Sequence, residues 1–231
     1  IQPNEFWQGV EFLTNAGKNN ELGLLTPGLG LERFMDIRAD EAEARAGIEG
    51  GTPRTIEGPL YVAGAPESQG FARLDDGSES DQAELLFMQG TVFDADGKPV
   101  PGAQVEVWHA NLMGSYSFFD SSQSHFNLRR TIITDAQGRY GFQTIMPKGY
   151  GCPPGGSTAT LLDALGRHGQ RPAHIHFFVS APGQRKLTTQ INIDGDEYLW
   201  DDFAFASREG LVPPVTQVDS PAAIAGRGVD K

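Results

Sequence analysis

The stretch that decides the fold reads Arg171-Pro172-Ala173-His174-Ile175-His176-Phe177-Phe178-Val179. Its aromatic and β-branched residues predict a strand over 174–179. Successive side chains of a strand point to opposite faces, so His174 and His176 share one face, about 7 Å apart, and Ile175 turns away. Two imidazoles on one rigid strand can reach a single transition-metal ion. The alternative is a half-buried strand whose two histidines are held by ordinary hydrogen bonds.

Short apolar runs separated by turn signals continue on both sides of this stretch, from residue 59 onward. Their spacing is typical of an all-β sandwich. We expect 174–179 to pair with 187–193, and 130–134 to form a hairpin with 140–145 through a turn at 135–138. The expected strands are 85–93, 103–109, 130–134, 140–145, 174–179 and 187–193.

The first fifty residues have a different pattern. Apolar residues recur at helical spacing over 4–20 and again over 29–46, and the Gly- and Pro-containing segment 22–28 between them reads as a loop. We expect both helices to pack against the β domain. The predicted fold is therefore mainly β, a β-sandwich domain at 51–231 preceded by an α-helical linker segment at 1–50.

Composition restricts the class of protein. The chain has 231 residues with 39% hydrophobic residues, enough for one large domain with an appendage. The net charge of −12 disfavours a nucleic-acid partner, and no apolar run approaches the ~20 residues of a membrane span. No signal peptide is visible at the start, and the single cysteine excludes an intramolecular disulfide, so we expect a cytoplasmic protein.

Two tyrosines lie in loops that do not read as core. Tyr116 follows the strand at 103–109, and Tyr150 lies in a loop at 146–154 that prolines stiffen. Each alone is also compatible with a packing or hydrogen-bonding role. Together with His174 and His176, however, they form a mixed nitrogen and oxygen donor set with two negative charges. Hard anionic donors favour Fe(III) over Fe(II), Zn(II) or Cu(I), and four ligands leave a position open.

Several motifs around these residues resemble one enzyme family, the intradiol ring-cleavage dioxygenases. The resemblance covers roughly residues 20–215 and is greatest to the members that act on catechol, the catechol 1,2-dioxygenases. The matching motifs are Thr55-Ile56-Glu57-Gly58-Pro59-Leu60-Tyr61, Gly114-Ser115-Tyr116, Gly149-Tyr150-Gly151-Cys152-Pro153-Pro154, Gly166-Arg167-His168-Gly169-Gln170-Arg171-Pro172-Ala173-His174-Ile175-His176 and Arg185-Lys186-Leu187-Thr188-Thr189-Gln190-Ile191-Asn192.

The resemblance implies one non-haem Fe(III) per chain, and cleavage of catechol by O2 to cis,cis-muconate. The implied metal ligands are Tyr116, Tyr150, His174 and His176. By family pattern Tyr150 is released when catechol binds. Arg171 is implied to stabilise negative charge on the substrate ring, with Gln190 as its partner; an ordinary salt bridge is the alternative for Arg171.

The resemblance also implies an apolar wall for a flat aromatic diol. Each wall residue taken alone reads equally as plain core. Leu24 and Ala204 resemble the catechol-preferring members, and the preference among catechol, methylcatechols and chlorocatechols stays open. The implied substrate-binding residues are Leu24, Pro27, Ile56, Pro59, Leu60, Cys152, Phe203 and Ala204.

Family members form a homodimer through their N-terminal helices, with phospholipid where the helices meet. We therefore expect a homodimer and a possible bound phospholipid, although both ends of the chain look short for the family. Two histidines lie outside the matching motifs: we expect His109 to be a structural hydrogen-bonding residue and His125 to be exposed.

Two other classes of protein fit part of the sequence. The turns over 90–103 and 134–140 resemble prealbumin-like binding modules, which lack the two tyrosines and the His-x-His pair. A cupin-type metal enzyme would need a further histidine and a carboxylate at suitable spacing, and we find neither.

Overall fold

Strand β9 (His174–Ser180) forms as the His-x-His alternation predicts, and it lies inside a five-stranded sheet. It pairs antiparallel with β4 (Gln104–His109) on one side and with β10 (Leu187–Asn192) on the other, so the expected pairing with 187–193 is confirmed. The strand order of this sheet is β1-β5-β4-β9-β10, where β1 is Glu67–Gln69 and β5 is Arg129–Ile133. The computed structural model describes residues 1–48 and 50–220; residues 221–231, the end of the predicted β domain, lie outside this range.

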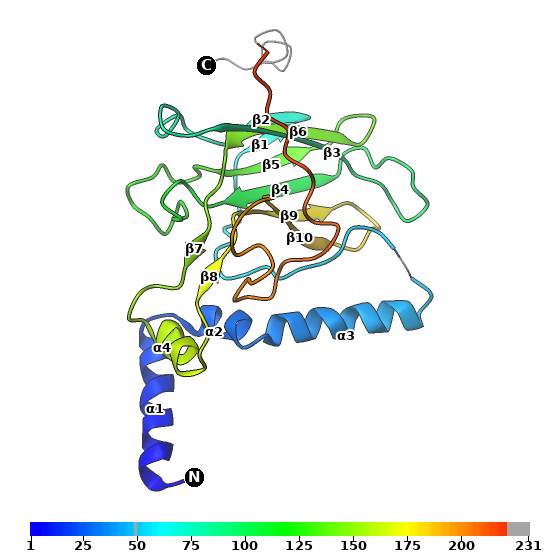
Figure 1. Cartoon of the computed structure of the whole chain (residues 1–231). Coiled ribbons are helices and arrows are strands. Elements are labelled where there is room, and N and C mark those ends of the chain that lie inside the picture. The colour runs from blue at the N-terminus through cyan, green and yellow to red at the C-terminus, as the bar shows by residue number, and fades with distance from the viewer. Residues whose placement is uncertain (49, 221–231) are drawn as a thin grey trace.

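A second sheet lies against the first (Figure 1). It has the order β2-β6-β3, formed by Phe71–Arg73, Arg139–Ile145 and Leu85–Thr91. A short ribbon of β7 (Tyr150–Gly151) and β8 (Gln170–Arg171) leads away from the two sheets toward the helices.

The core lies between the two sheets. Phe142 of β6 packs there against Val107 of β4 and against Ile175 and Phe177 of β9, all almost fully buried. A fully buried aliphatic or aromatic side chain contributes about 1.5–3 kcal/mol by leaving water, so this layer stabilises the sandwich. The predicted mainly-β sandwich with an N-terminal helical segment is confirmed.

The other face of the five-stranded sheet carries polar side chains in register. Trp108 of β4 lies directly opposite Arg129 of β5 on one side and opposite His176 of β9 on the other. Gln190 of β10 lies opposite His176. Four neighbouring strands therefore present Arg129, Trp108, His176 and Gln190 as one row on the face turned away from the core.

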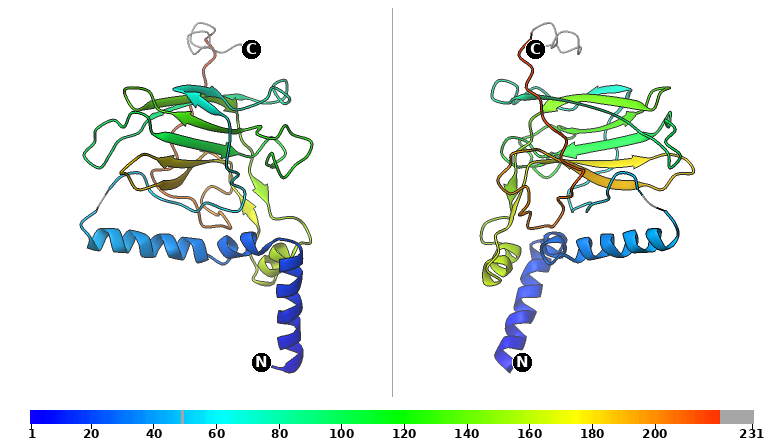
Figure 2. Two further views of the ribbon diagram at one scale, coloured as in Figure 1. Left: turned by 180° about the vertical axis from the view of Figure 1, so that it is seen from behind. Right: turned by 45° about the vertical axis from the view of Figure 1, so that its right-hand side comes forward.

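The helices lie beyond the β9 and β10 end of the five-stranded sheet (Figure 1). The helices are α1 (Pro3–Lys18), α2 (Leu22–Gly28), α3 (Leu31–Arg45) and α4 (Ser157–Ala164). Helix α1 begins with a capping box between Gln2 and Glu5, and both views of Figure 2 show it projecting away from the sheets. No helix in the described residues is long and apolar enough to cross a bilayer.

Two expectations about local structure were wrong, and one helix was missed. Residues 22–28 form helix α2 and not a loop, because Leu25 and Pro27 become buried. The turn at 135–138 forms, but it joins β5 of one sheet to β6 of the other, so these strands are not a hairpin. Helix α4 was not anticipated.

The two predicted helices meet the β domain differently. Helix α1 extends away from it, and Phe6 and Leu13 are each more than half exposed. Helix α3 runs alongside the β domain, where Asp36 pairs with Arg208, although Phe34 is more than half exposed. The apolar periodicity correctly predicted both helices.

Candidate metal centre and substrate slot

The two histidines of β9 converge on one point. Both rings are buried, and their Nε2 atoms lie 3.1 Å apart. The Nδ1 atom of His174 lies 2.6 Å from the Pro172 carbonyl oxygen, which only accepts, so Nδ1 carries the proton and Nε2 carries the lone pair. The Nδ1 atom of His176 is buried and has no hydrogen-bond partner among the described residues.

The two tyrosines reach the same place from different loops. Tyr116 ends a tight turn in which the Asn111 side-chain oxygen accepts hydrogen bonds from the backbone of Met113 and Ser115. Tyr150 lies on β7, directly opposite Arg171 of β8. The two phenol oxygens are 3.3 Å apart, so the two loops bring both hydroxyls together.

A glycine makes this meeting possible. Gly114 has φ +76°, and a Cβ atom placed there would lie 2.6 Å from the Cβ atom of Tyr150. Any larger residue would push the two tyrosine loops apart. Gly114 therefore fixes how closely Tyr116 can approach Tyr150.

The four predicted ligands form one cluster. The ring centres of Tyr150 and His174 are 5.6 Å apart, and those of Tyr116 and His176 are 6.4 Å apart. Donors bound about 2.0–2.2 Å from one ion lie about 3 Å from each other, which matches the 3.1 Å and 3.3 Å separations. No three His, Cys, Asp or Glu residues of the described chain gather as a metal site, and the tyrosine hydroxyls are the other predicted donors in this cluster.

Burial sets the protonation of these ligands. It lowers the pKa of His174 to about 3, with Arg171 as a second cause, so the imidazole is neutral at physiological pH. Burial and then His174 lower the pKa of His176 in the same direction. Burial, and then the neighbouring Tyr150, raise the pKa of Tyr116 well above its usual value, so a bound cation is needed to stabilise this residue as a phenolate.

Arg171 lies buried beside the ligands. Its Nη2 atom donates to the Gln190 side-chain oxygen at 2.9 Å, which confirms the predicted contact, and to Asp202 at 3.1 Å. Burial opposes the charge of Arg171, but Asp202 and the neighbouring Tyr150 together outweigh it and raise the pKa of the guanidinium above its usual value. The Nη1 atom also lies 2.9 Å from Nε2 of His174, so a metal at that nitrogen requires this N–H to turn away.

A narrow slot opens beside Tyr150 and Arg171. Its volume is about 20 Å³, close to the space of one water molecule. Helix α2 forms one wall, the 56–60 segment another and the 203–204 segment a third. The apolar side chains lining it include every residue predicted to bind substrate: Leu24, Pro27, Ile56, Pro59, Leu60, Cys152, Phe203 and Ala204.

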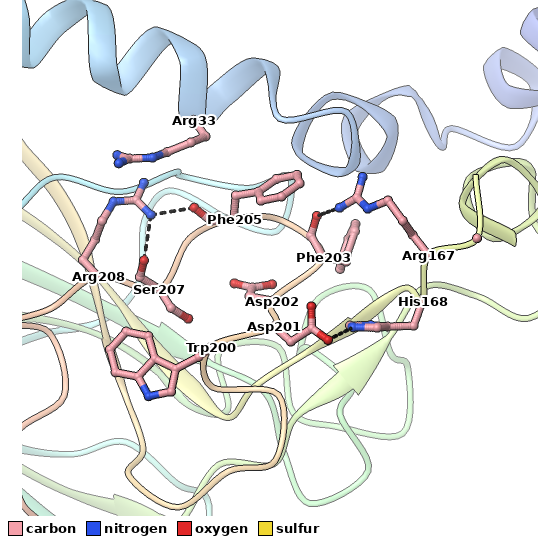
Figure 3. A pocket seen from close by; sticks show the side chains of 11 residues that line it. Arg33, Arg167, His168, Trp200, Asp201, Asp202, Phe203, Phe205, Ser207 and Arg208 are labelled. Carbon is pink, nitrogen blue, oxygen red and sulfur yellow. Dashed lines mark hydrogen bonds and ion pairs between the residues drawn. The ribbon is translucent and has the colours of Figure 1, made fainter. Parts of the chain in front are cut away.

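A larger cleft of about 470 Å³ lies on the other side of the 202–203 segment (Figure 3). Its walls carry Arg33, Arg208, the exposed Trp200 and the ion pair between His168 and Asp201. None of the four clustered ligands lines this cleft. The smaller slot is therefore the candidate substrate site, because it is apolar and opens on the ligands.

Comparison with known proteins agrees with this geometry. A family profile described as "Dioxygenase" matches residues 56–228, and one described as "Catechol dioxygenase N terminus" matches residues 1–47. The catechol 1,2-dioxygenase of Acinetobacter guillouiae is 64% identical over 231 residues, covering 100% of this chain and 76% of that protein. The chain belongs to the catechol 1,2-dioxygenase family.

Solved structures and more distant relatives place it among the members named for catechol. The crystal structure of wild-type Acinetobacter radioresistens catechol 1,2-dioxygenase superposes with a TM-score of 0.97 at 68% identity, over 100% of this chain and 75% of that one. The hydroxyquinol 1,2-dioxygenase of a Rhizobium species is 35% identical over 228 residues, covering 95% of this chain and 74% of that protein. Membership of the catechol 1,2-dioxygenase family excludes the binding-module and cupin-type alternatives.

Three residues of the site were not predicted. Asp202 pairs with Arg171, Trp108 stacks on His176 with the ring planes 3° apart, and Arg129 lies over Tyr116. A buried arginine is stabilised by a nearby carboxylate, so an acidic residue near Phe203, such as Asp202, could have been predicted as the partner of Arg171. Of the histidines outside the site, His109 is a structural hydrogen-bonding residue and His125 is exposed, as expected for both.

Proposed function

We propose that this member of the catechol 1,2-dioxygenase family uses one non-haem Fe(III) ion to cleave catechol between its two hydroxyl-bearing carbons. Both oxygen atoms of O2 enter the product, cis,cis-muconate, and the two catechol hydroxyl protons are released. The observation that carries the proposal is the convergence of two phenol oxygens and two imidazole nitrogens beside an apolar slot.

The donors fit that ion. Tyr116, Tyr150, His174 and His176 would hold it, and the two phenolates supply the negative charge that a trivalent ion prefers. When bound, Fe(III) supplies a Lewis acid that draws electron density from a coordinated catecholate and makes its ring reactive toward O2. The remaining steps fall to the residues of this chain.

The narrowness of the slot supports a moving Tyr150. Tyr150 forms part of the wall of this narrow slot, so displacement of its side chain would widen the slot for a catechol ring. Tyr150 lines the slot and is partly exposed, whereas Tyr116 is buried and does not line it. A Tyr150 side chain that gives way to the substrate would take up a proton at Oη from a catechol hydroxyl.

Arg171 stabilises the negative charge that grows on the ring. Its guanidinium lines the slot and is held by Asp202 and Gln190, so it needs little reorganisation during the reaction. The Nη1 N–H of Arg171 now points at Nε2 of His174, and it would become free if a metal ion occupied that nitrogen.

The slot walls support a preference for small catechols. Leu24 and Ala204 line the slot, and each methylene-sized contact with a substrate alters specificity by about 1–3 kcal/mol. We therefore propose catechol itself as the main substrate, with methylcatechols and chlorocatechols as poorer ones.

The helices support a further part of this proposal. We propose that residues 1–50 are a linker and dimerisation segment, residues 51–231 the catalytic domain, and the assembly a cytoplasmic homodimer. Trp7 of α1 is 65% exposed and Met35 of α3 is 63% exposed, and apolar surface of this kind is typical of an interface between subunits or with a phospholipid. Helix α2 lies within the linker segment but also contributes to the catalytic domain, because its residues Leu24 and Pro27 line the slot.

The deciding experiment is the colour of the iron-loaded protein. Charge transfer from tyrosinate to Fe(III) should give broad visible absorption, and the protein should consume one O2 per catechol while muconate absorbance rises in the ultraviolet. Tyr150→Phe should change the colour, whereas Tyr140→Phe, beside the core, should not. A colourless protein with stoichiometric iron would contradict the proposal.

A further inference from the structure

Arg129 is a buried cation at one end of the polar row on the five-stranded sheet. Its exposed fraction is 1%, and it is among the largest fully buried side chains. It lies opposite Trp108, whose indole stacks on the ring of His176. Arg129 thus lies at the opposite end of this row from Gln190, the residue that contacts Arg171.

The contacts of Arg129 leave its charge without an acid. Its Nε and Nη2 atoms donate to the side-chain and backbone oxygens of Ser117, both at 3.0 Å. Its Nη1 atom is buried and has no hydrogen-bond partner, and no carboxylate of the described residues forms an ion pair with it. A buried charge without a counter-charge is strongly destabilising, so such an arrangement calls for a compensating anion.

The neighbouring group that can carry a compensating negative charge is Tyr116. The guanidinium carbon of Arg129 lies 5.8 Å from the centre of the Tyr116 ring, and the Ser117 hydrogen bonds hold the residue next to Tyr116 in place. Burial lowers the pKa of Arg129 only to about 10, so the guanidinium is charged at neutral pH. A metal-bound Tyr116 phenolate would supply the missing negative charge.

We propose that Arg129 is a positioning residue that acts through Tyr116: Ser117 holds the Arg129 guanidinium in place, and its positive charge lies behind the phenolate ligand. This inference rests on the proposed function, because it requires Tyr116 to bind iron as a phenolate. Outer partners of this kind tune a metal through its ligand, and their loss typically costs about 10–100-fold in metal affinity or activity.

The test compares Arg129→Met with Arg129→Lys in the iron-loaded protein. Charge transfer moves an electron away from the phenolate, and a nearby cation opposes that movement. Arg129→Met should therefore shift the visible band to longer wavelength and weaken iron binding about 10–100-fold, whereas Arg129→Lys should keep the band close to that of the wild type. In a Tyr150→Phe background the band arises from Tyr116 alone, and the same shift should appear there.

Arg130→Gln is the matched control. Arg130 is the next residue of the same strand and points to the other face, where it donates to the Arg73 carbonyl. Its loss changes the net charge equally and should leave the band unmoved. Should Arg129→Met fail to fold, Ser117→Ala removes a contact of Arg129 but keeps the charge, and the band should stay in place.

Two results would overturn the inference: an Arg129→Met band at the wild-type wavelength, or equal shifts in the Met and Lys variants. A band shift in Ser117→Ala would do the same, since it would trace the effect to loop position and not to charge. A wild-type protein that binds iron without any visible band would instead contradict the proposed function. The two failures are therefore distinguishable.

Discussion

The two faces of the five-stranded sheet are built from alternate residues of the same strands, yet they follow different rules. On the core face, Ile175 and Phe177 pack against the second sheet and need only apolar volume. On the other face, His174 and His176 each have specific neighbours, such as the Pro172 carbonyl and the Trp108 indole. A substitution on the core face of β9 should therefore change stability, whereas a substitution of the adjacent residue on the polar face should change metal binding or catalysis.

The largest effect is expected at the centre of the polar face. His176→Ala removes one of the four proposed ligands, and since loss of an outer partner typically costs about 10–100-fold, loss of a ligand should cost more. We expect iron content and catechol-dependent O2 uptake to fall to background. Folding should persist, as measured by circular dichroism. Full iron occupancy in His176→Ala would break the contrast between the two faces.

A smaller loss of activity is expected at Arg171. Arg171→Lys keeps the charge but cannot bond Gln190 and Asp202 together, so the cation will be misplaced. We expect kcat to fall about 100-fold, in the range found when one charge-stabilising donor is removed, while iron and its visible band remain. Unchanged kcat would show that Arg171 only neutralises Asp202.

His109 allows a sharper test, because it is a polar residue on the core side of β4. It joins the two sheets, with Nε2 2.6 Å from the Thr144 hydroxyl, and burial lowers its pKa to about 4. Because this pKa lies below the unfolded value of about 6.5, the contribution is complete above pH 6.5 and is lost as pH falls toward 4.

At pH 5 the predicted loss in the free energy of unfolding from His109 is about 2 kcal/mol relative to pH 7. Urea unfolding at the two pH values measures it. His109→Asn lacks the titrating ring and should lose less over the same range, and the difference removes contributions from His174 and His176. Equal losses in both proteins would refute this role for His109.

The smallest effect is expected beside the ligands. Ile175 lies between His174 and His176 in the sequence but points into the core. Ile175→Val removes one methylene there, and such changes typically cost about 0.5–1.5 kcal/mol of stability. Iron content, colour and kcat should stay at wild-type values. A change in the visible band would show that the two faces are coupled through the strand.

Local pattern explains which parts of the molecule could be predicted. The alternation within 174–179 determines which face each side chain occupies, so the pairing of His174 with His176 needed no tertiary information. Likewise, the turn at 135–138 forms by hydrogen bonds within itself, such as that from Gly138 to the Asp135 carbonyl. Which sheet each flanking strand joins depends on distant partners, and that prediction was wrong.

Long-range packing explains the other errors. Segment 22–28 contains glycine and proline, which locally disfavour helix, yet it is helical because it packs on the slot. A Cβ atom at Gly23 would lie 2.9 Å from Pro59, a contact that no local pattern reveals. The partnership of Arg171 with Asp202 spans 31 residues and depends on the same tertiary packing.

The contact between Gly114 and Tyr150 has a consequence for engineering. A methyl group at position 114 would collide with the Cβ atom of Tyr150. The sequences of the two tyrosine loops are therefore expected to change together. A chimaera that imports 111–116 from a distant homologue without 149–154 would bring mismatched surfaces together. Grafts that alter this enzyme's selectivity should therefore transplant both segments as one cassette.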